Sequence, residues 1–142
     1  MQPEELKFLY DIQTSIQSIK DFTIDIESFQ DFDENKLIRR AVERELEIIG
    51  EAINRLLKIN DSIPITNARK IVNLRNWVIH SYDNVDSVII WAILHKDLAF
   101  LEKEVSDLLN SYFTKFIPNK QIPHEIEIFS PFRTDFFVPI LR

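Results

Sequence analysis

The 142-residue chain contains a single glycine, and this scarcity constrains its fold more than any other feature. Tight strand connections depend on glycine for backbone conformations that other residues adopt only at a cost. Six prolines interrupt the chain in few places, so long segments remain free to form helix. The sequence therefore predicts an all-α protein and argues against a β-sandwich or barrel.

Hydrophobic residues recur at intervals of three and four, the spacing of amphipathic helices. The pattern predicts four main helices, at residues 3–29, 34–59, 67–81 and 87–112. Their N-caps are predicted at Asp33, at Thr66, and at Asp86 or Ser87. Because the connections are short, we expect an antiparallel up-down bundle in which the wide apolar stripe of residues 34–59 is the best buried.

Gly50 falls inside the second predicted helix, where it costs about 1 kcal/mol of helix propensity relative to alanine. Two interpretations remain open. Either a neighbouring helix backbone approaches closely there, or the glycine is simply tolerated.

The character of the chain changes at Pro118. The remaining residues hold three further prolines and short apolar runs without helical period. We therefore expect a helical bundle over residues 1–117 and an extended C-terminal arm over residues 118–142. Packing of the arm on the bundle, contact with a second subunit and partial disorder all remain open.

Composition excludes several classes of site. With no cysteine, the chain has no disulfide, thiolate nucleophile or Cys-ligated zinc, and with one glycine it has no glycine-rich phosphate loop. His80, His95 and His124 lie far apart, and the glutamates at 43, 47 and 51 are predicted to form an exposed helix face, so we expect no metal and no cofactor. No apolar run approaches the roughly 18 residues of a membrane span, and the start Met-Gln-Pro-Glu-Glu lacks a signal-peptide layout. We expect a cytoplasmic protein without a membrane partner.

The net charge of −6 hides a local asymmetry. Residues 1–35 carry a net charge of −7, and residues 81–142 a net charge of −3. Residues 36–80 hold 9 basic and 5 acidic side chains, a net charge of +4. The total argues against a general polyanion binder, whereas the basic middle segment leaves room for a local anion site.

Four side chains that could bind an anion or transfer a proton lie near the end of the third predicted helix: Arg75, Asn76, His80 and Tyr82. At about 100° per residue, the first three point away from the apolar face that Leu74 and Trp77 mark.

Val72 and Ile79 fall on the same outward face, which predicts that something covers it. A second protomer related by a two-fold axis is the simplest cover, since it would join two copies of the helix end into one cleft. Contact with the first helix or with the arm is the alternative.

These groups suit phosphodiester cleavage without a metal. A histidine can take the proton of a ribose 2′-hydroxyl or protonate the departing 5′-oxygen, while an arginine stabilises charge on the phosphoryl oxygens. Asn76 could orient the imidazole or donate to phosphate. The plainer interpretation is a surface cation and a histidine near a helix C-terminus, and spacing alone does not decide between them.

At these residues the chain resembles the HEPN superfamily, and within it the HepT-like toxins of HepT/MntA-type toxin–antitoxin pairs. The resemblance rests on an Arg, four residues, a His, one residue and a Tyr, here Arg75 to Tyr82. It also rests on the stretch from Glu45 to Ile53, similar to a helix signature of the family, and on Val85-Asp86 followed by residues 88–91. Together these features cover roughly Leu6 to Leu109.

The resemblance implies a helical dimer that acts as a metal-independent endoribonuclease, with Arg75 and His80 catalytic and Asn76 supporting. It also implies a cognate nucleotidyltransferase antitoxin that attaches AMP to Tyr82, placing negative charge where RNA phosphate should bind. Two departures are Glu45, where an amide is expected, and the long arm. The alternative is a dimeric binding module of the same fold that recognises a nucleotidyltransferase or a nucleotide and cleaves nothing.

Overall fold

The described residues fold into a bundle of helices with no strand among them. The structure is a computed structural model, and it describes residues 2–80 and 86–116. Its helices are α1 (Pro3–Phe22), α2 (Phe29–Glu34), α3 (Lys36–Ile59), α4 (Ala68–His80), α5 (Ser87–Lys96) and α6 (Leu98–Phe116). The predicted all-α fold is confirmed, and the predicted arm lies outside the described residues.

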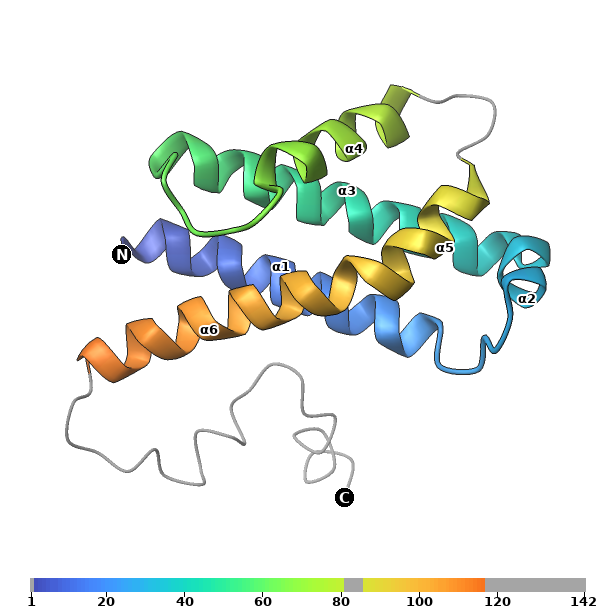
Figure 1. The fold of residues 1–142 in the computed structure, drawn as a ribbon, viewed down its shortest axis with the longest axis horizontal. Coiled ribbons are helices and arrows are strands. Elements are labelled where there is room, and N and C mark those ends of the chain that lie inside the picture. Colours follow the sequence, from blue (N-terminus) through green and yellow to red (C-terminus); the bar gives the residue numbers. More distant parts are fainter. Residues whose placement is uncertain (1, 81–85, 117–142) are drawn as a thin grey trace, which may run out of the picture.

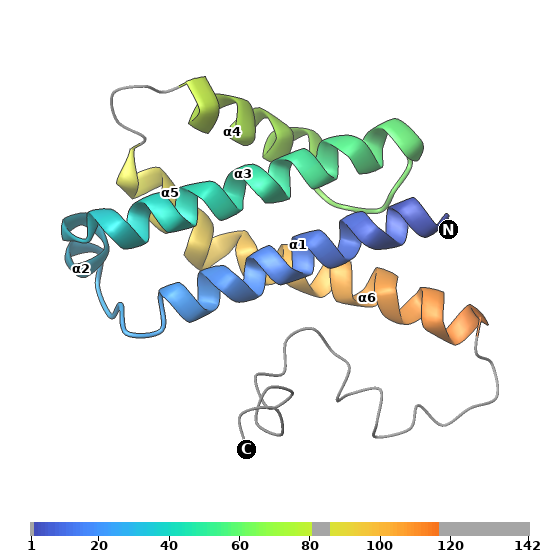
Figure 2. The same cartoon turned by 180° about the vertical axis from the view of Figure 1, so that it is seen from behind.

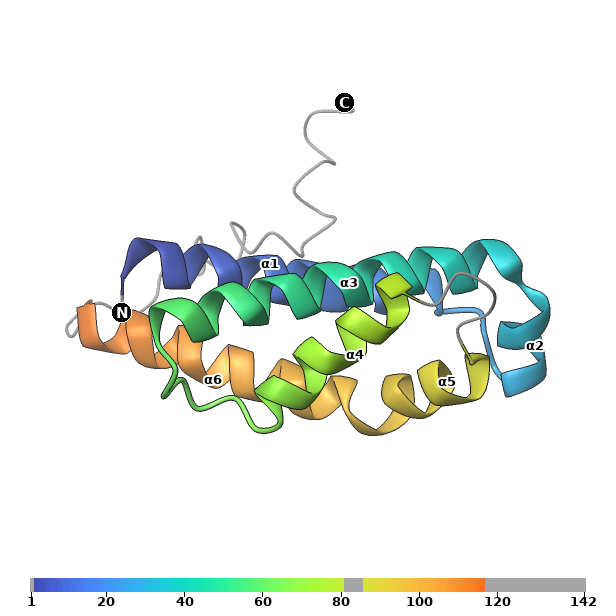
Figure 3. The ribbon, with the colours of Figure 1, turned by 90° about the horizontal axis from the view of Figure 1, so that it is seen from above.

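The long helices run in alternating directions, as expected for an up-down bundle (Figure 1). α3 lies between α1 and α4, and α6 packs on the other side of α1 (Figures 1 and 2). Seen from above, α4 crosses α3 obliquely, while the short α2 closes the end of the bundle next to α5 (Figure 3). This arrangement places α4 on a flank of the bundle, supported mainly by α3.

The apolar stripes meet in one core. α1 contributes Leu9, Ile12, Ile16 and Ile19, each at most 1% exposed. α3 adds the buried side chains Val42, Leu46, Ile49, Ile53, Leu56 and Leu57. Burial of each large aliphatic side chain stabilises the fold by about 1.5–3 kcal/mol, so the packing of α1 on α3 stabilises the helix that supports α4. Leu37, predicted as part of this stripe, is instead 80% exposed at the start of α3.

The first connection differs from the prediction. α1 ends at Phe22 with Thr23 as its C-cap, whose hydroxyl donates to the carbonyl of Ile19, and a separate helix begins after the N-cap Ser28. The N-cap of α3 is Asn35, whose side chain accepts from the amide of Ile38 at 3.1 Å. Asp33, the predicted cap, lies inside α2 and accepts from the hydroxyl of Ser87 on α5.

The later helix boundaries are closer to the prediction. Asp86 caps α5 by accepting from the amide of Val88 at 2.9 Å, as expected. Asn67, whose φ is 63°, directly precedes α4. Thr66, the predicted N-cap of this helix, donates its backbone N–H to the carboxylate of Glu104. The last predicted helix is interrupted at Asp97, a residue type with low helix propensity.

Candidate functional site

Arg75 lies against α3 at the position of Gly50. A Cβ placed on Gly50 would collide with the Cβ of Arg75 and lie 2.8 Å from its Cγ. Only a residue without a side chain therefore allows α4 to approach α3 at this crossing. Of the two interpretations of Gly50, the structure supports close approach, made by the aliphatic stem of an arginine.

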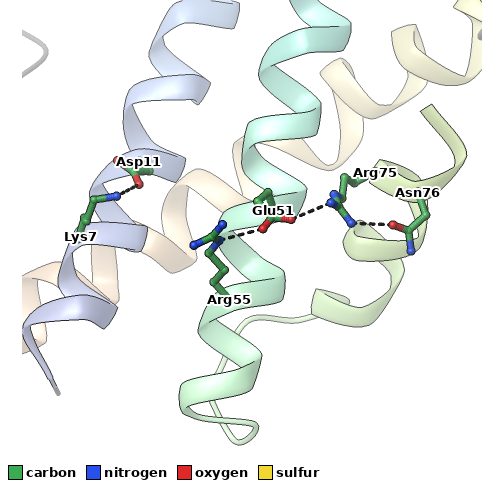
Figure 4. A network of polar contacts seen from close by, with 6 residues as sticks. All are labelled: Lys7, Asp11, Glu51, Arg55, Arg75 and Asn76. Carbon is green, nitrogen blue, oxygen red and sulfur yellow. Dashed lines mark hydrogen bonds and ion pairs between the residues drawn. The ribbon is translucent and has the colours of Figure 1, made fainter. Parts of the chain in front are cut away.

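The guanidinium of Arg75 is held along one edge rather than left pointing into solvent. Its Nη2 lies 2.8 Å from a carboxylate oxygen of Glu51, and its Nη1 donates to the side-chain oxygen of Asn76 at 2.8 Å (Figure 4). The side chain is 25% exposed, and its Nε is buried without a hydrogen-bond partner among the described residues. The expected outward direction is therefore wrong in part, because Gly50 lets α3 cover the stem.

Glu51 connects two cations. One carboxylate oxygen accepts from Nε of Arg55 at 2.8 Å and the other faces Arg75 (Figure 4). The hydrogen bond from Arg55 lowers the pKa of Glu51 below its ordinary value, and the charges of Arg75, Arg55 and Lys58 add to this against the opposing effect of burial. The carboxylate is thus ionised at neutral pH and sits in a positive local potential.

Asn76 is exposed and lies beside the guanidinium of Arg75. Because arginine only donates, the amide oxygen of Asn76 must face Arg75, which turns its NH2 group toward other acceptors. Arg75 and Asn76 together present donors of the kind that bind phosphate oxygens.

His80 is the last residue of α4. It follows Arg75 by five residues, or about 7.5 Å along the helix axis. The side chains of residues 78–80, including Ile79, lie outside the described part of the structure, as does all of Tyr82. Val72, expected on the outward face, is partly buried against the core of its own chain.

The acidic face predicted on α3 is not uniformly exposed. Glu43 is only 8% exposed and pairs with Arg40 at 3.0 Å, and Glu47 pairs with Arg44 at 3.1 Å. Across residues 2–80 and 86–116, no three acidic or histidine side chains gather closely enough to hold a metal ion. His95 lies against Trp91 on α5, with its Nδ1 2.9 Å from the carbonyl oxygen of that residue.

A shallow groove of about 400 Å³ begins at Arg75 and extends across α3 to α1. Its lining combines four cationic side chains, three carboxylates and one aromatic ring: Lys7, Arg44, Arg55 and Arg75, then Asp11, Glu47 and Glu51, and Phe8. Sequence reasoning missed this groove and the role of Glu51. The available signal was Glu51 next to Gly50 and four residues before Arg55, a favourable helical spacing for an ion pair.

Comparison with known proteins bears on this geometry. Residues 12–108, which run from α1 into α6 and include Arg75 and His80, match the family described as Ribonuclease HepT-like. The chain belongs to the HepT-like family. A Methanocaldococcus jannaschii protein named "Putative RNase MJ1380" is 40% identical over 99 residues, covering 69% of this chain and 90% of that protein. The "Probable ribonuclease HepT" of Thermococcus cleftensis is 33% identical over 112 residues, covering 76% and 98%.

The HepT-like assignment rests on sequence, since no solved structure shows significant similarity to the chain. Among the helices of the described residues, none combines the length and apolar character needed to cross a membrane.

Proposed function

We propose that the protein is a metal-independent endoribonuclease that acts as the toxin of a prokaryotic toxin–antitoxin pair. The observation that carries the proposal is the unbroken run Arg75-x4-His80-x-Tyr82 within the HepT-like segment, with its arginine at one end of a groove lined by charged side chains. The ribonuclease names of the relatives support the same reaction class.

The proposed reaction is an internal transesterification. The 2′-oxygen attacks the adjacent phosphorus, the bond from phosphorus to the 5′-oxygen breaks, and the products are a 2′,3′-cyclic phosphate and a 5′-hydroxyl. One His80 accepts the 2′-proton and another group, in our proposal His80 of a second protomer, donates a proton to the leaving oxygen. Arg75 binds the non-bridging oxygens, where negative charge increases, and Asn76 donates beside it.

The activity is tested by incubating wild type, Arg75→Ala and His80→Ala with tRNA and mRNA in EDTA. Wild type should cut RNA, and each variant should lose at least about a hundredfold in rate, the usual contribution of one acid–base or charge-stabilising group. Identical RNA patterns for wild type and His80→Ala would refute the catalytic role of His80. Absence of RNA cleavage by the wild type would favour the alternative, a non-catalytic dimeric module that recognises a nucleotidyltransferase or a nucleotide.

The proposal includes a homodimer and regulation by a nucleotidyltransferase antitoxin that AMPylates Tyr82. A two-fold arrangement would bring two copies of the α4 end together, which supplies both an acid and a base. Light scattering of Ile79→Asp should show a smaller species than wild type, and an unchanged dimer would place the interface elsewhere.

Mass analysis after co-expression with the antitoxin should show AMP-sized increments that Tyr82→Phe abolishes.

A further inference from the structure

The groove that begins at Arg75 is continuous with the aromatic ring of Phe8 on α1. Arg55 joins the two ends: its Nε contacts Glu51, which pairs with Arg75, and its Cζ lies 6.0 Å from the centre of the Phe8 ring. A nucleic-acid strand bound at Arg75 therefore has a contiguous path across α3 to α1.

The ring of Phe8 is partly buried, so one part packs on the core while another part faces the groove. Two cations lie over the ring, Nζ of Lys7 at 5.2 Å and Cζ of Arg55 at 6.0 Å from its centre, so a base that stacks on Phe8 takes the place of one of them. Aromatic faces beside cationic side chains are the combination by which proteins hold single-stranded nucleic acid, with bases stacked on rings and phosphates near the cations.

The charged side chains of the groove leave a small positive excess. Its lining holds four cationic and three carboxylate side chains. Each carboxylate is already paired with a groove cation: Asp11 with Lys7, Glu47 with Arg44, and Glu51 with Arg55 and Arg75. The pKa of Glu51 is lowered first by its hydrogen bond from Arg55 and further by the charges of Arg75, Arg55 and Lys58. These ion pairs are all partly exposed, so each contributes little stability, and Lys7 or Arg55 can turn from its carboxylate toward a phosphate at low cost.

We propose that this groove is a subsite for single-stranded RNA, in which a base flanking the scissile phosphate stacks on Phe8 while Lys7 and Arg55 contact the backbone. The inference rests on the proposed ribonuclease function and adds to it a preference for unpaired RNA. A duplex would keep its bases stacked on each other and could not offer one to the ring.

The test is fluorescence anisotropy with a labelled single-stranded RNA of ten nucleotides, in EDTA, using the full chain with His80→Ala so that the probe stays intact. Adding Phe8→Leu should raise the Kd about fivefold or more, the loss of one stacked base, while Phe8→Tyr should stay within about twofold of the parent. Phe100→Leu is the matched control, because Phe100 is 52% exposed on α6 and does not line the groove.

Lys7→Gln provides a second variant that does not threaten folding, since the Lys7 side chain is 68% exposed. It should weaken RNA binding and reduce the slope of log K against log salt by about 1, whereas Lys103→Gln on α6 should change neither.

The outcomes separate this inference from the function on which it rests. Unchanged RNA binding by Phe8→Leu and Lys7→Gln, with His80-dependent cleavage by wild type, overturns the subsite alone. Failure of wild type to bind or cut any RNA overturns both. Unchanged RNA binding together with weaker binding of the nucleotidyltransferase would assign the groove to a protein partner and overturn the RNA subsite.

Discussion

Substituting Gly50 by alanine tests the crossing of α3 and α4. The added Cβ would overlap the Cβ of Arg75 and lie 2.8 Å from its Cγ. Both Cβ atoms are fixed to their backbones, so no rotamer change relieves the overlap and α4 must move. Overpacking of this kind costs about 1–3 kcal/mol, and the rigidity of the contact places it in the upper half of that range. The higher helix propensity of alanine offsets about 1 kcal/mol of this cost, so the free energy of unfolding should fall by about 1–2 kcal/mol.

Thermal unfolding followed by circular dichroism measures this loss. For a chain of this size, it corresponds to a decrease in Tm of roughly 4–8 °C. The shift of α4 also moves Arg75 away from Glu51, so RNA cleavage should fall with stability.

A double-mutant cycle isolates the contact, because Arg75→Gly removes the opposing Cβ. In that background Gly50→Ala should be neutral or stabilising, whereas equal costs in the two backgrounds would refute the proposed close packing.

Two further predictions concern the Arg75 network. Glu51→Gln should lower the Tm at pH 7 by a small amount, and the difference from wild type should close as the pH falls below about 4.5, because a carboxylate with a depressed pKa loses its stabilising charge when it is protonated. A difference independent of pH between 3 and 7 would contradict the ion pairs of Glu51. Arg75→Lys should lose at least about tenfold in kcat/KM for RNA, since one ammonium cannot reproduce the two-nitrogen edge that contacts Glu51 and Asn76; near wild-type turnover would show that only the charge matters.

Much of the fold could be predicted from sequence because the apolar period of α3 is long and unbroken. The same reasoning failed at residues 23–35, where Ile26 and Phe29 continue the helical spacing but Thr23 and Ser28 end one helix and start the next. At these residues the local caps, and not the hydrophobic spacing, determine where the helices end and begin.

The site was predicted less completely for a geometric reason. The period of α4 gives the direction of Arg75 relative to its own helix axis, yet only the position of α3 shows that Gly50 admits the arginine stem. The partnership of Arg75 with Glu51 likewise joins residues 24 positions apart, a contact that no local pattern encodes.

The measurement that tests the central claim most directly is cleavage of a short RNA in EDTA, with the nucleotide 5′ to the cut replaced by its 2′-deoxy form. The proposed chemistry predicts that the unmodified RNA yields a 2′,3′-cyclic phosphate and a 5′-hydroxyl, detected by mass spectrometry, and that the deoxy substrate stays intact. Cleavage of the deoxy substrate, or cleavage that requires a divalent metal, would contradict it.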